Sequence, residues 1–338
     1  MQTRTLGSTG LSVSCLAFDT TLLQSVDFNQ AQAILNTAYE CGITFYSTGR
    51  GDTDSEIKVG YGLNLRQHNA AVLAKTQERD GRKVARAIER SIRNLHTDCV
   101  DVYQIGALNM EPELALIQGE GGAIAAMRKA QQEGKIRCVG ASSLRLDILE
   151  TIIVAEQVDV VEFPVNIFDL DFIERLVPLA KEKGVGVIGC FPFAGGSFGD
   201  PDMALPFALD QDVGSVLAGM HTIEHVHRNS AVATHFMPLT DEQRQRLFEV
   251  AKSLGRDYCR FCGQCAPCPK GIDVPKVLEL LRASWRFHLR DWAAREYESL
   301  PVQAAECDEC GVCEKACAYG VNVVSLMDRT AHHFAYHG

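Results

Sequence analysis

The sequence predicts an α/β protein in which a (β/α)8 barrel is followed by a small, mainly helical domain. Eight short apolar runs alternate with longer stretches of helical period between residues 11 and 218. Runs that are apolar throughout are typical of parallel strands buried on both faces. Eight of the thirteen cysteines lie beyond these runs, between residues 259 and 317. We therefore expect two domains, at residues 1–238 and 239–338.

The predicted strands leave room for a helix between each strand and the next. The stretch after the third run carries Val84, Ile88, Ile92 and Leu95, whose spacing of three and four forms one apolar stripe. Eight such units over roughly 220 residues suit a closed TIM barrel better than an open doubly wound sheet, so chemistry is expected at the C-terminal strand ends. We expect the strands at 11–18, 43–46, 71–75, 100–105, 138–141, 158–163, 185–190 and 215–218.

Two further helices are expected after the barrel. Thr240 begins a Thr-x-x-Gln capping box, and apolar residues then repeat at helical spacing up to Leu254. This helix should lead the chain into the C-terminal domain. The second helix should lie between the two groups of cysteines, and its apolar stripe comprises Val277, Leu280, Leu281, Trp285 and Trp292.

The cysteines of the C-terminal domain have the spacing of iron–sulfur ligands. In each run, three cysteines separated by two residues allow one loop to direct three thiolates at one cluster, while a fourth reaches a second cluster. This predicts two 4Fe-4S clusters. With crossed ligation, as in two-cluster ferredoxins, Cys317 completes the first set and Cys268 the second. The first run is Cys259, Cys262, Cys265 and Cys268, and the second is Cys307, Cys310, Cys313 and Cys317.

Zinc and disulfides fit these cysteines less well. Structural zinc usually takes Cys-x2-Cys pairs with a long gap between them. Disulfides need an oxidising compartment, whereas the first residues lack the apolar core of a secretory signal, so we expect a cytoplasmic protein. A single cluster stays open, because the first run has only two residues before Cys268 and Ala318 stands where proline usually follows the second run.

Charge and hydropathy limit the partners. The net charge is −10, and no Lys/Arg-rich stretch occurs. Nucleic acid and anionic membranes both require a basic face, so neither is expected to bind. No apolar run approaches the roughly 20 residues of a membrane span. A small-molecule substrate and a redox carrier protein remain as the expected partners.

The order of several motifs resembles the aldo-keto reductases along nearly the whole barrel. The motifs are MQTRTLGSTGLSVS, GITFYSTG, AVLAKTQ, DCVDVYQIG, GKIRCVGASS, FPVNIFD, GVGVIGCFPFAGG and AGMHTIEHVHRN. The tail resembles the ferredoxin-like extension of one subgroup of that family. This resemblance implies an oxidoreductase whose Asp, Tyr, Lys and His gather at the barrel mouth, where the tyrosine protonates a carbonyl oxygen while NADPH delivers hydride.

Most of that catalytic set is missing from this chain. Only the lysine is retained, as Lys75, whereas Ser47, Asp52 and Gly106 stand near the places of the Asp, Tyr and His. The proton donor of the ordinary reduction is therefore absent. Lys75 and Asp52 are our catalytic candidates, with Lys75 acting as an acid or base of lowered pKa. Alternatively, Lys75 is an inherited lysine in an ion pair with Asp52 or Asp54.

The positions that the resemblance assigns to a nicotinamide cofactor are also altered. Glu162 replaces a glutamine, and its charge would repel phosphate. Cys190 replaces the aromatic residue that stacks on nicotinamide, and His221 replaces the arginine expected at the 2′-phosphate. NADPH binding is therefore left open. The candidate cofactor-binding residues are Ser142, Glu162, Asn166, Gly195, Gly219 and Asn229.

Our leading hypothesis is an aldo-keto reductase-like iron–sulfur oxidoreductase with a non-standard mechanism. It would move electrons between 4Fe-4S clusters and a small molecule or cofactor at the barrel mouth. Two alternatives stay open. One is a non-catalytic pseudoenzyme that senses redox state or binds a partner. The other is a lyase or isomerase that uses Lys75 and Asp52 for proton transfer.

Overall fold

The computed structural model contains two compact units, which are described separately. The barrel unit comprises residues 1–192 and 200–243, and the cysteine-rich unit comprises residues 193–199 and 244–338. The division falls a few residues beyond position 238, and the sequence did not indicate that the loop 193–199 belongs with the second unit. The residues that the structure describes are 1–49, 54–65, 69–198 and 200–335.

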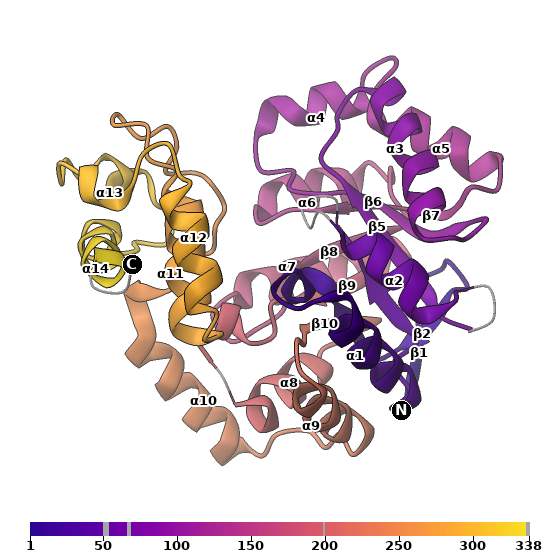
Figure 1. Cartoon of the computed structure of the whole chain (residues 1–338). Helices are drawn as coiled ribbons and strands as arrows, with labels where there is room; N and C mark the ends of the chain where they lie inside the picture. The colour runs from indigo at the N-terminus through magenta and orange to yellow at the C-terminus, as the bar shows by residue number, and fades with distance from the viewer. Residues whose placement is uncertain (50–53, 66–68, 199, 336–338) are drawn as a thin grey trace. The chain divides into compact units, whose positions relative to one another are not determined.

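Eight parallel strands close into a barrel in the order β10-β3-β4-β5-β6-β7-β8-β9, which confirms the predicted (β/α)8 fold (Figure 1). Every residue of β8 and β9 is buried, as expected for apolar strands covered on both faces. The strands are β3 (Leu16–Asp19), β4 (Phe45–Ser47), β5 (Ala71–Thr76), β6 (Val100–Ile105), β7 (Ile136–Ser142), β8 (Val160–Pro164), β9 (Gly186–Cys190) and β10 (Ser215–Gly219).

The prediction of one strand over residues 11–18 is wrong. This stretch forms β2 (Ser12–Ser14), which pairs antiparallel with β1 (Thr3–Thr5), and then the barrel strand β3. The pairing changes at Cys15, whose amide bonds back to Gln2 while its carbonyl accepts from Val216. The β1–β2 hairpin contributes Leu6 and Val13 to the core inside the barrel. It therefore adds apolar packing to the strands that carry the site.

Helices connect the strands and bury their apolar stripes. In α3 the predicted stripe is buried at Val84 and Ile88, and Asp80 caps the helix by accepting from the Lys83 amide at 3.0 Å. The helices of the barrel unit are α1 (Phe28–Glu40), α2 (Ser55–Leu63), α3 (Gly81–Asn94), α4 (Glu111–Gln118), α5 (Ala123–Gln132), α6 (Leu146–Val154), α7 (Leu170–Glu182), α8 (Pro201–Leu209), α9 (Ile223–Thr234) and the start of α10 (Asp241–Leu254).

The cysteine-rich unit repeats one structural motif. Each cysteine run is followed by a helix, α11 (Val274–Arg286) after the first and α14 (Val323–Ala335) after the second. The two loops also share backbone geometry, because Phe261 and Glu309 both have φ of +55° at equivalent positions. The next glycines, at 263 and 311, have φ of +75° and +69°, a region that glycine adopts without strain.

The stretch between the cysteine runs forms two helices rather than the single one expected. The α11 helix ends at Arg286, and α12 (Arg290–Glu298) begins after His288, which has φ of +58°. Buried side chains of α11 and α14 form the core of the unit, and the Tyr297 and Phe334 rings stack at 4.2 Å. A short α13 (Val312–Ala316) lies within the second run. Among the described residues of the whole chain, no helix is long and apolar enough to cross a membrane.

Two glycines of α2 give a matched test of barrel packing. A Cβ at Gly60 would overlap the carbonyl oxygen of Asn94, whereas a Cβ at Gly62 would meet only the flexible end of Leu35, at 3.0 Å. Gly60→Ala should lower the free energy of unfolding by about 1–2 kcal/mol despite its better helix propensity. Gly62→Ala should stay within about 1 kcal/mol of wild type. Chemical denaturation measures both, and equal effects would contradict the close α2–α3 contact.

Candidate functional site

A polar cavity of about 220 Å³ opens at the C-terminal ends of β3 to β7. Because these strands are parallel and neighbouring, their last residues meet at one edge of the barrel. Asp19, Ser47 and Ser142 end β3, β4 and β7, Lys75 lies at the end of β5, and Gly106 follows β6. The structure therefore places Lys75 at the barrel mouth, where catalytic groups of this fold are found.

An ion pair between Lys75 and Glu162 lies at the mouth. The Lys75 Nζ donates to Glu162 Oε1 at 2.8 Å, and the two side chains are 23% and 8% exposed. The second carboxylate oxygen of Glu162 accepts from Gln104 Nε2 at 3.1 Å. Among the described residues, the buried Oε1 of Gln104 has no hydrogen-bond partner. This oxygen is a hydrogen-bond acceptor beside the ion pair, although Gln104 does not itself line the mouth cavity.

The pKa of Lys75 differs from the sequence expectation. Burial acts to lower it, but the carboxylates of Glu162 and Asp19 outweigh burial and raise the pKa above its ordinary value. The expected lowered pKa is therefore wrong, and the neighbouring carboxylates favour the ammonium form of Lys75. The expected ion pair with Asp54 is also wrong, since Asp54 pairs with Lys58 at 2.8 Å. Asp52 lies outside the described residues.

Asp19 and Gln104 were not among the site residues predicted from the sequence. Asp19 lines the cavity and accepts hydrogen bonds from the amide and hydroxyl of Thr21, at 3.0 and 2.7 Å. The expected first strand stopped at Phe18, so its terminal carboxylate was not recognised as a strand-end residue. Gln104 lies between Tyr103 and Ile105 near the end of β6, and an amide in this apolar part of the strand was the available signal. Both residues place additional polar groups around Lys75.

No tyrosine lines the described part of the mouth cavity. Tyr46 is fully buried, and its hydroxyl donates to the Ile43 carbonyl at 2.8 Å. Burial raises the pKa of Tyr46 well above its ordinary value. Residues 50–53, which lie outside the described residues, also include no tyrosine. Among the residues described at the mouth cavity, there is therefore no phenolic proton donor.

The structure brings together only some of the candidate cofactor residues. Ser142 lines the cavity and is paired in register with Glu162 on the adjacent strand. Asn166 is buried, and its amide donates to Asp169 and to the Phe191 carbonyl, at 2.9 and 3.1 Å, so it holds the loop after β8.

The other three candidates have local structural roles. Gly219 ends β10 with the Leu22 side chain against it, and Asn229 is buried in α9. Gly195 belongs to the cysteine-rich unit. None of these three lines the described part of the mouth cavity.

The cysteines of the first run lie close to Cys317 of the second. Burial is the main cause of the raised pKa of Cys262, and repulsion from Cys317 adds to it. The pKa of Cys265 is raised to about 12, first by burial and then by Cys259 and Cys262. Cys307 similarly acts on Cys313. Cys310 is exposed, and Cys268 packs against the core of the unit.

This donor set fits iron–sulfur clusters. Among the described residues, no three His, Cys, Asp or Glu side chains are arranged to hold a metal ion, so the fit rests on the chemistry of the donors. Burial raises the pKa of Cys259, Cys262 and Cys265, and bound iron would supply the positive centre that favours their thiolates. Backbone amides also point at the sulfurs, from Phe261 to Cys259 at 3.4 Å and from Val321 to Cys317 at 3.5 Å. Such N–H···S bonds are among the features that tune cluster potentials.

The Lys75–Glu162 pair can be tested with a double-mutant cycle. Lys75→Met leaves the Glu162 carboxylate buried without its partner and should lower the free energy of unfolding by about 3 kcal/mol. The Lys75→Met/Glu162→Gln double variant should lose less than the sum of the single variants. Because the pKa of Lys75 is raised in the folded protein, the lysine's contribution is fully present below its unfolded-state pKa of about 10.4 and is lost only as the pH rises through the folded-state pKa. Denaturation from pH 7 to 9 should therefore give a constant coupling energy, and strict additivity would refute the pair.

Comparisons with known proteins agree with this arrangement. L-galactose dehydrogenase of Arabidopsis thaliana is 29% identical over 304 residues, which cover 74% of this chain and 93% of the relative. The uncharacterized oxidoreductase YqkF of Bacillus subtilis is 27% identical over 217 residues, covering 58% and 66%. The solved structure of the aldo-keto reductase AKR11C1 of Bacillus halodurans, in its holo form, superposes with a TM-score of 0.62 at 25% identity, covering 75% and 97%.

Models of two protein families match the chain. The aldo/keto reductase family matches residues 16–202, which is more than half of the sequence, and a 4Fe-4S dicluster domain matches residues 258–322. The first match covers most of the closed barrel, and the second covers both cysteine runs. The chain therefore belongs to the aldo/keto reductase family, as a member with a C-terminal 4Fe-4S domain.

Proposed function

We propose that this protein is an oxidoreductase that reduces a small carbonyl compound at the barrel mouth with electrons from two 4Fe-4S clusters. The observation that carries the proposal is the Lys75–Glu162 ion pair at a mouth where no tyrosine lines the described cavity. The family and the 4Fe-4S domain support the oxidoreductase class. A redox carrier protein would supply the electrons.

The electron count is consistent with this proposal. Reduction of a carbonyl to an alcohol consumes two electrons and two protons. When bound, each 4Fe-4S cluster supplies one electron, so two clusters meet the demand of one turnover. Negative charge develops on the substrate oxygen as electrons arrive, and the Lys75 ammonium is placed to stabilise it. The two protons are taken from solvent. Lys75 thus acts through its charge, and Asp52 remains a candidate for positioning the substrate.

The polar groups of the mouth favour a substrate with hydroxyl groups. The Asp19 carboxylate lines the cavity, and Gln104 Oε1 is a buried acceptor next to the ion pair. Both accept hydrogen bonds, which suits donors such as sugar hydroxyls. The name of the relative L-galactose dehydrogenase supports the same substrate class. A polyhydroxylated aldehyde or ketone is therefore the proposed substrate class.

A nicotinamide cofactor is the alternative electron source, and family membership supports it. The hydrogen bonds of Glu162 disfavour nicotinamide binding, because its two carboxylate oxygens already accept from Lys75 and Gln104. The lyase or isomerase alternative is disfavoured by the raised pKa of Lys75, since a lysine acts as a base only when it is deprotonated. A protein that only senses redox state would bind a partner without turnover.

The proposal predicts that the substrate reoxidises reduced clusters. Anaerobically purified protein, reduced and freed of reductant, should regain its visible cluster absorbance on addition of an active sugar carbonyl. Lys75→Met should slow this reoxidation by about a hundredfold, because it removes the charge that stabilises the substrate oxygen. Lys129→Met, at an exposed position on α5, is the matched control and should react like wild type. A panel of carbonyls, quinones and enones that leaves the clusters reduced would refute the proposal.

Addition of NADPH to the oxidised protein distinguishes a carrier protein from a nicotinamide cofactor as the electron source. Under the proposal, millimolar NADPH leaves the cluster absorbance unchanged. Bleaching of that absorbance would instead assign the electrons to a nicotinamide bound at the altered site.

Crossed ligation of two clusters makes a second prediction. Cys317 lies near Cys259 and Cys262, so it should complete the first cluster although it belongs to the second run. Cys262→Ser and Cys317→Ser should then remove the same signal from the electron paramagnetic resonance spectrum of the reduced protein. Cys310→Ser and Cys268→Ser should remove the other signal. Each variant should lose about half of the iron. Loss of the same signal in Cys310→Ser and Cys317→Ser would show that ligation is not crossed.

A further inference from the structure

A second cavity lies wholly within the cysteine-rich unit, and its charge is opposite to that of the chain. Its volume is about 450 Å³, within the range of small-molecule sites. The chain has a net charge of −10, yet this lining contains five basic side chains and one acidic one. A concave surface of one charge sign attracts ligands of the other sign. The basic residues are Lys252, Arg256, Arg282, Arg286 and Arg329, and the acidic residue is Asp257.

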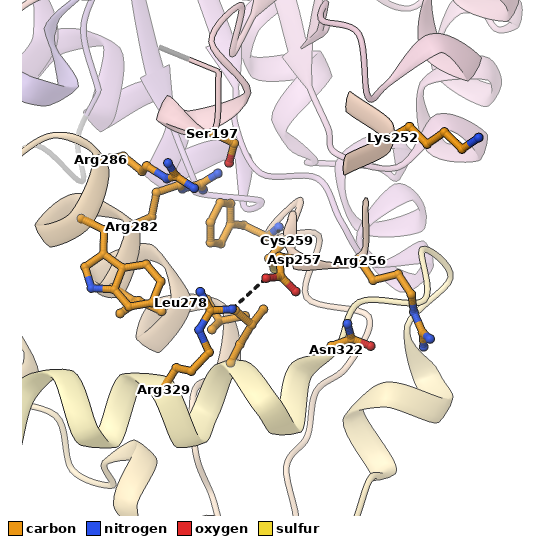
Figure 2. Close-up of a pocket in the computed structure, with 14 residues that line it drawn as sticks. Ser197, Lys252, Arg256, Asp257, Cys259, Leu278, Arg282, Arg286, Asn322 and Arg329 are labelled. Atoms are coloured by element: carbon orange, nitrogen blue, oxygen red, sulfur yellow. Dashed lines mark hydrogen bonds and ion pairs between the residues drawn. The ribbon is translucent and has the colours of Figure 1, made fainter. Parts of the chain in front are cut away.

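These basic side chains differ in the partners that they already have. Arg329 is paired with Asp257 at 2.7 Å, and the Arg256 Nε donates to the Gly320 carbonyl at 2.7 Å. Arg286 is exposed, and no hydrogen bond or ion pair joins it to another residue that the structure describes. Figure 2 shows Arg282 and Arg286 reaching from α11 toward Ser197, while Lys252 and Arg256 extend away from them. Arg282 and Arg286 are therefore the side chains placed to hold an anion beside Ser197.

The loop 193–199 brings backbone close to these two arginines. A Cβ at Gly195 would collide with the Arg282 guanidinium, and one at Gly196 would lie 2.7 Å from the Arg286 Cβ. The Arg282 guanidinium also lies 3.6 Å from the centre of the Phe261 ring and 3.4 Å from the Ala194 carbonyl. It is thus fixed by an aromatic ring and a carbonyl, as preorganised binding groups are.

The remaining wall of the cavity is apolar and aromatic. Leu278, Leu281 and Leu326 line it together with Trp285. The Trp285 indole is held by a hydrogen bond to His333 at 3.0 Å and by the Arg329 guanidinium 4.9 Å from its centre. A fixed aromatic side chain next to a guanidinium pair suits a planar ring that carries an anionic group. Cys259, a candidate cluster ligand, lies in the same wall.

We propose that this cavity binds a planar organic phosphate, with its phosphate on Arg282 and Arg286 and its ring against Trp285. Guanidinium groups bind phosphate through paired hydrogen bonds. The cavity should therefore prefer a ligand that carries a phosphate to a purely apolar ligand. This cavity and the mouth cavity share no lining residue, and the proposal does not depend on the reaction proposed for the barrel. Because Cys259 shares the cavity, the bound anion also favours the more oxidised, less negative form of a cluster held there.

Flavin mononucleotide and riboflavin are suitable probes, because they share a ring system and differ by one phosphate. Isothermal titration calorimetry on anaerobic, cluster-loaded protein should show binding of flavin mononucleotide, competition by inorganic pyrophosphate, and at least tenfold weaker binding of riboflavin. Arg286→Gln should weaken flavin mononucleotide binding about tenfold or more. Arg290→Gln, an exposed arginine of α12 that does not line the cavity, is the matched control and should bind like wild type.

The reduction potential of the cluster provides a second readout, independent of the binding measurement. Saturation with flavin mononucleotide should shift the potential of one cluster to a more negative value in wild type, and Arg286→Gln should abolish the shift at the same ligand concentration. Equal binding of riboflavin and flavin mononucleotide would overturn the proposal, as would binding that Arg286→Gln leaves unchanged. Absence of binding by both flavin mononucleotide and pyrophosphate at millimolar concentration would also overturn it. The proposal would likewise be overturned if an acidic carrier protein, and not these phosphates, bound in a way that depends on Arg286.

Discussion

Closure of the barrel is the constraint on which the candidate active site depends. Strand β10 pairs with β9 on one side and with β3 on the other, so no strand of the barrel has an open edge. Lys75 and Glu162 lie on β5 and β8, which are not neighbours, and only the curvature of a closed sheet brings their charges to 2.8 Å. The carboxylate of Asp19 on β3 also acts electrostatically on Lys75 and raises its pKa. A local slip in strand register would therefore separate the groups that fix the charge of the mouth.

The sequence predicted the fold well because its signals are local. Apolar runs predicted the barrel strands, and cysteine spacing predicted the 4Fe-4S domain that the family comparison supports. The errors have physical reasons. The run 11–18 contains no glycine or proline to mark the change at Cys15, where pairing passes from the hairpin to the barrel. The stripe ending at Trp292 does not reveal the positive φ of His288 that divides α11 from α12.

The site was less predictable because its chemistry depends on contacts between distant segments. The position of Lys75 at a strand end was correct, but its partner was sought in the nearby loop instead of on β8. This error also reversed the expected direction of its pKa shift. The basic cavity of the second unit draws residues from the loop 193–199, α10, α11 and α14. No single stretch of sequence is basic enough to indicate it.

The discontinuity of the cysteine-rich unit determines how this protein can be dissected. The unit takes in the loop after β9, and the glycines of that loop accommodate Arg282 and Arg286 of α11. No single cut in the chain separates the two units, because the loop lies within the sequence of the barrel. A chain shortened to end at Gln243 would therefore still carry part of the cysteine-rich unit. It would expose a loop fitted to a helix that is no longer present.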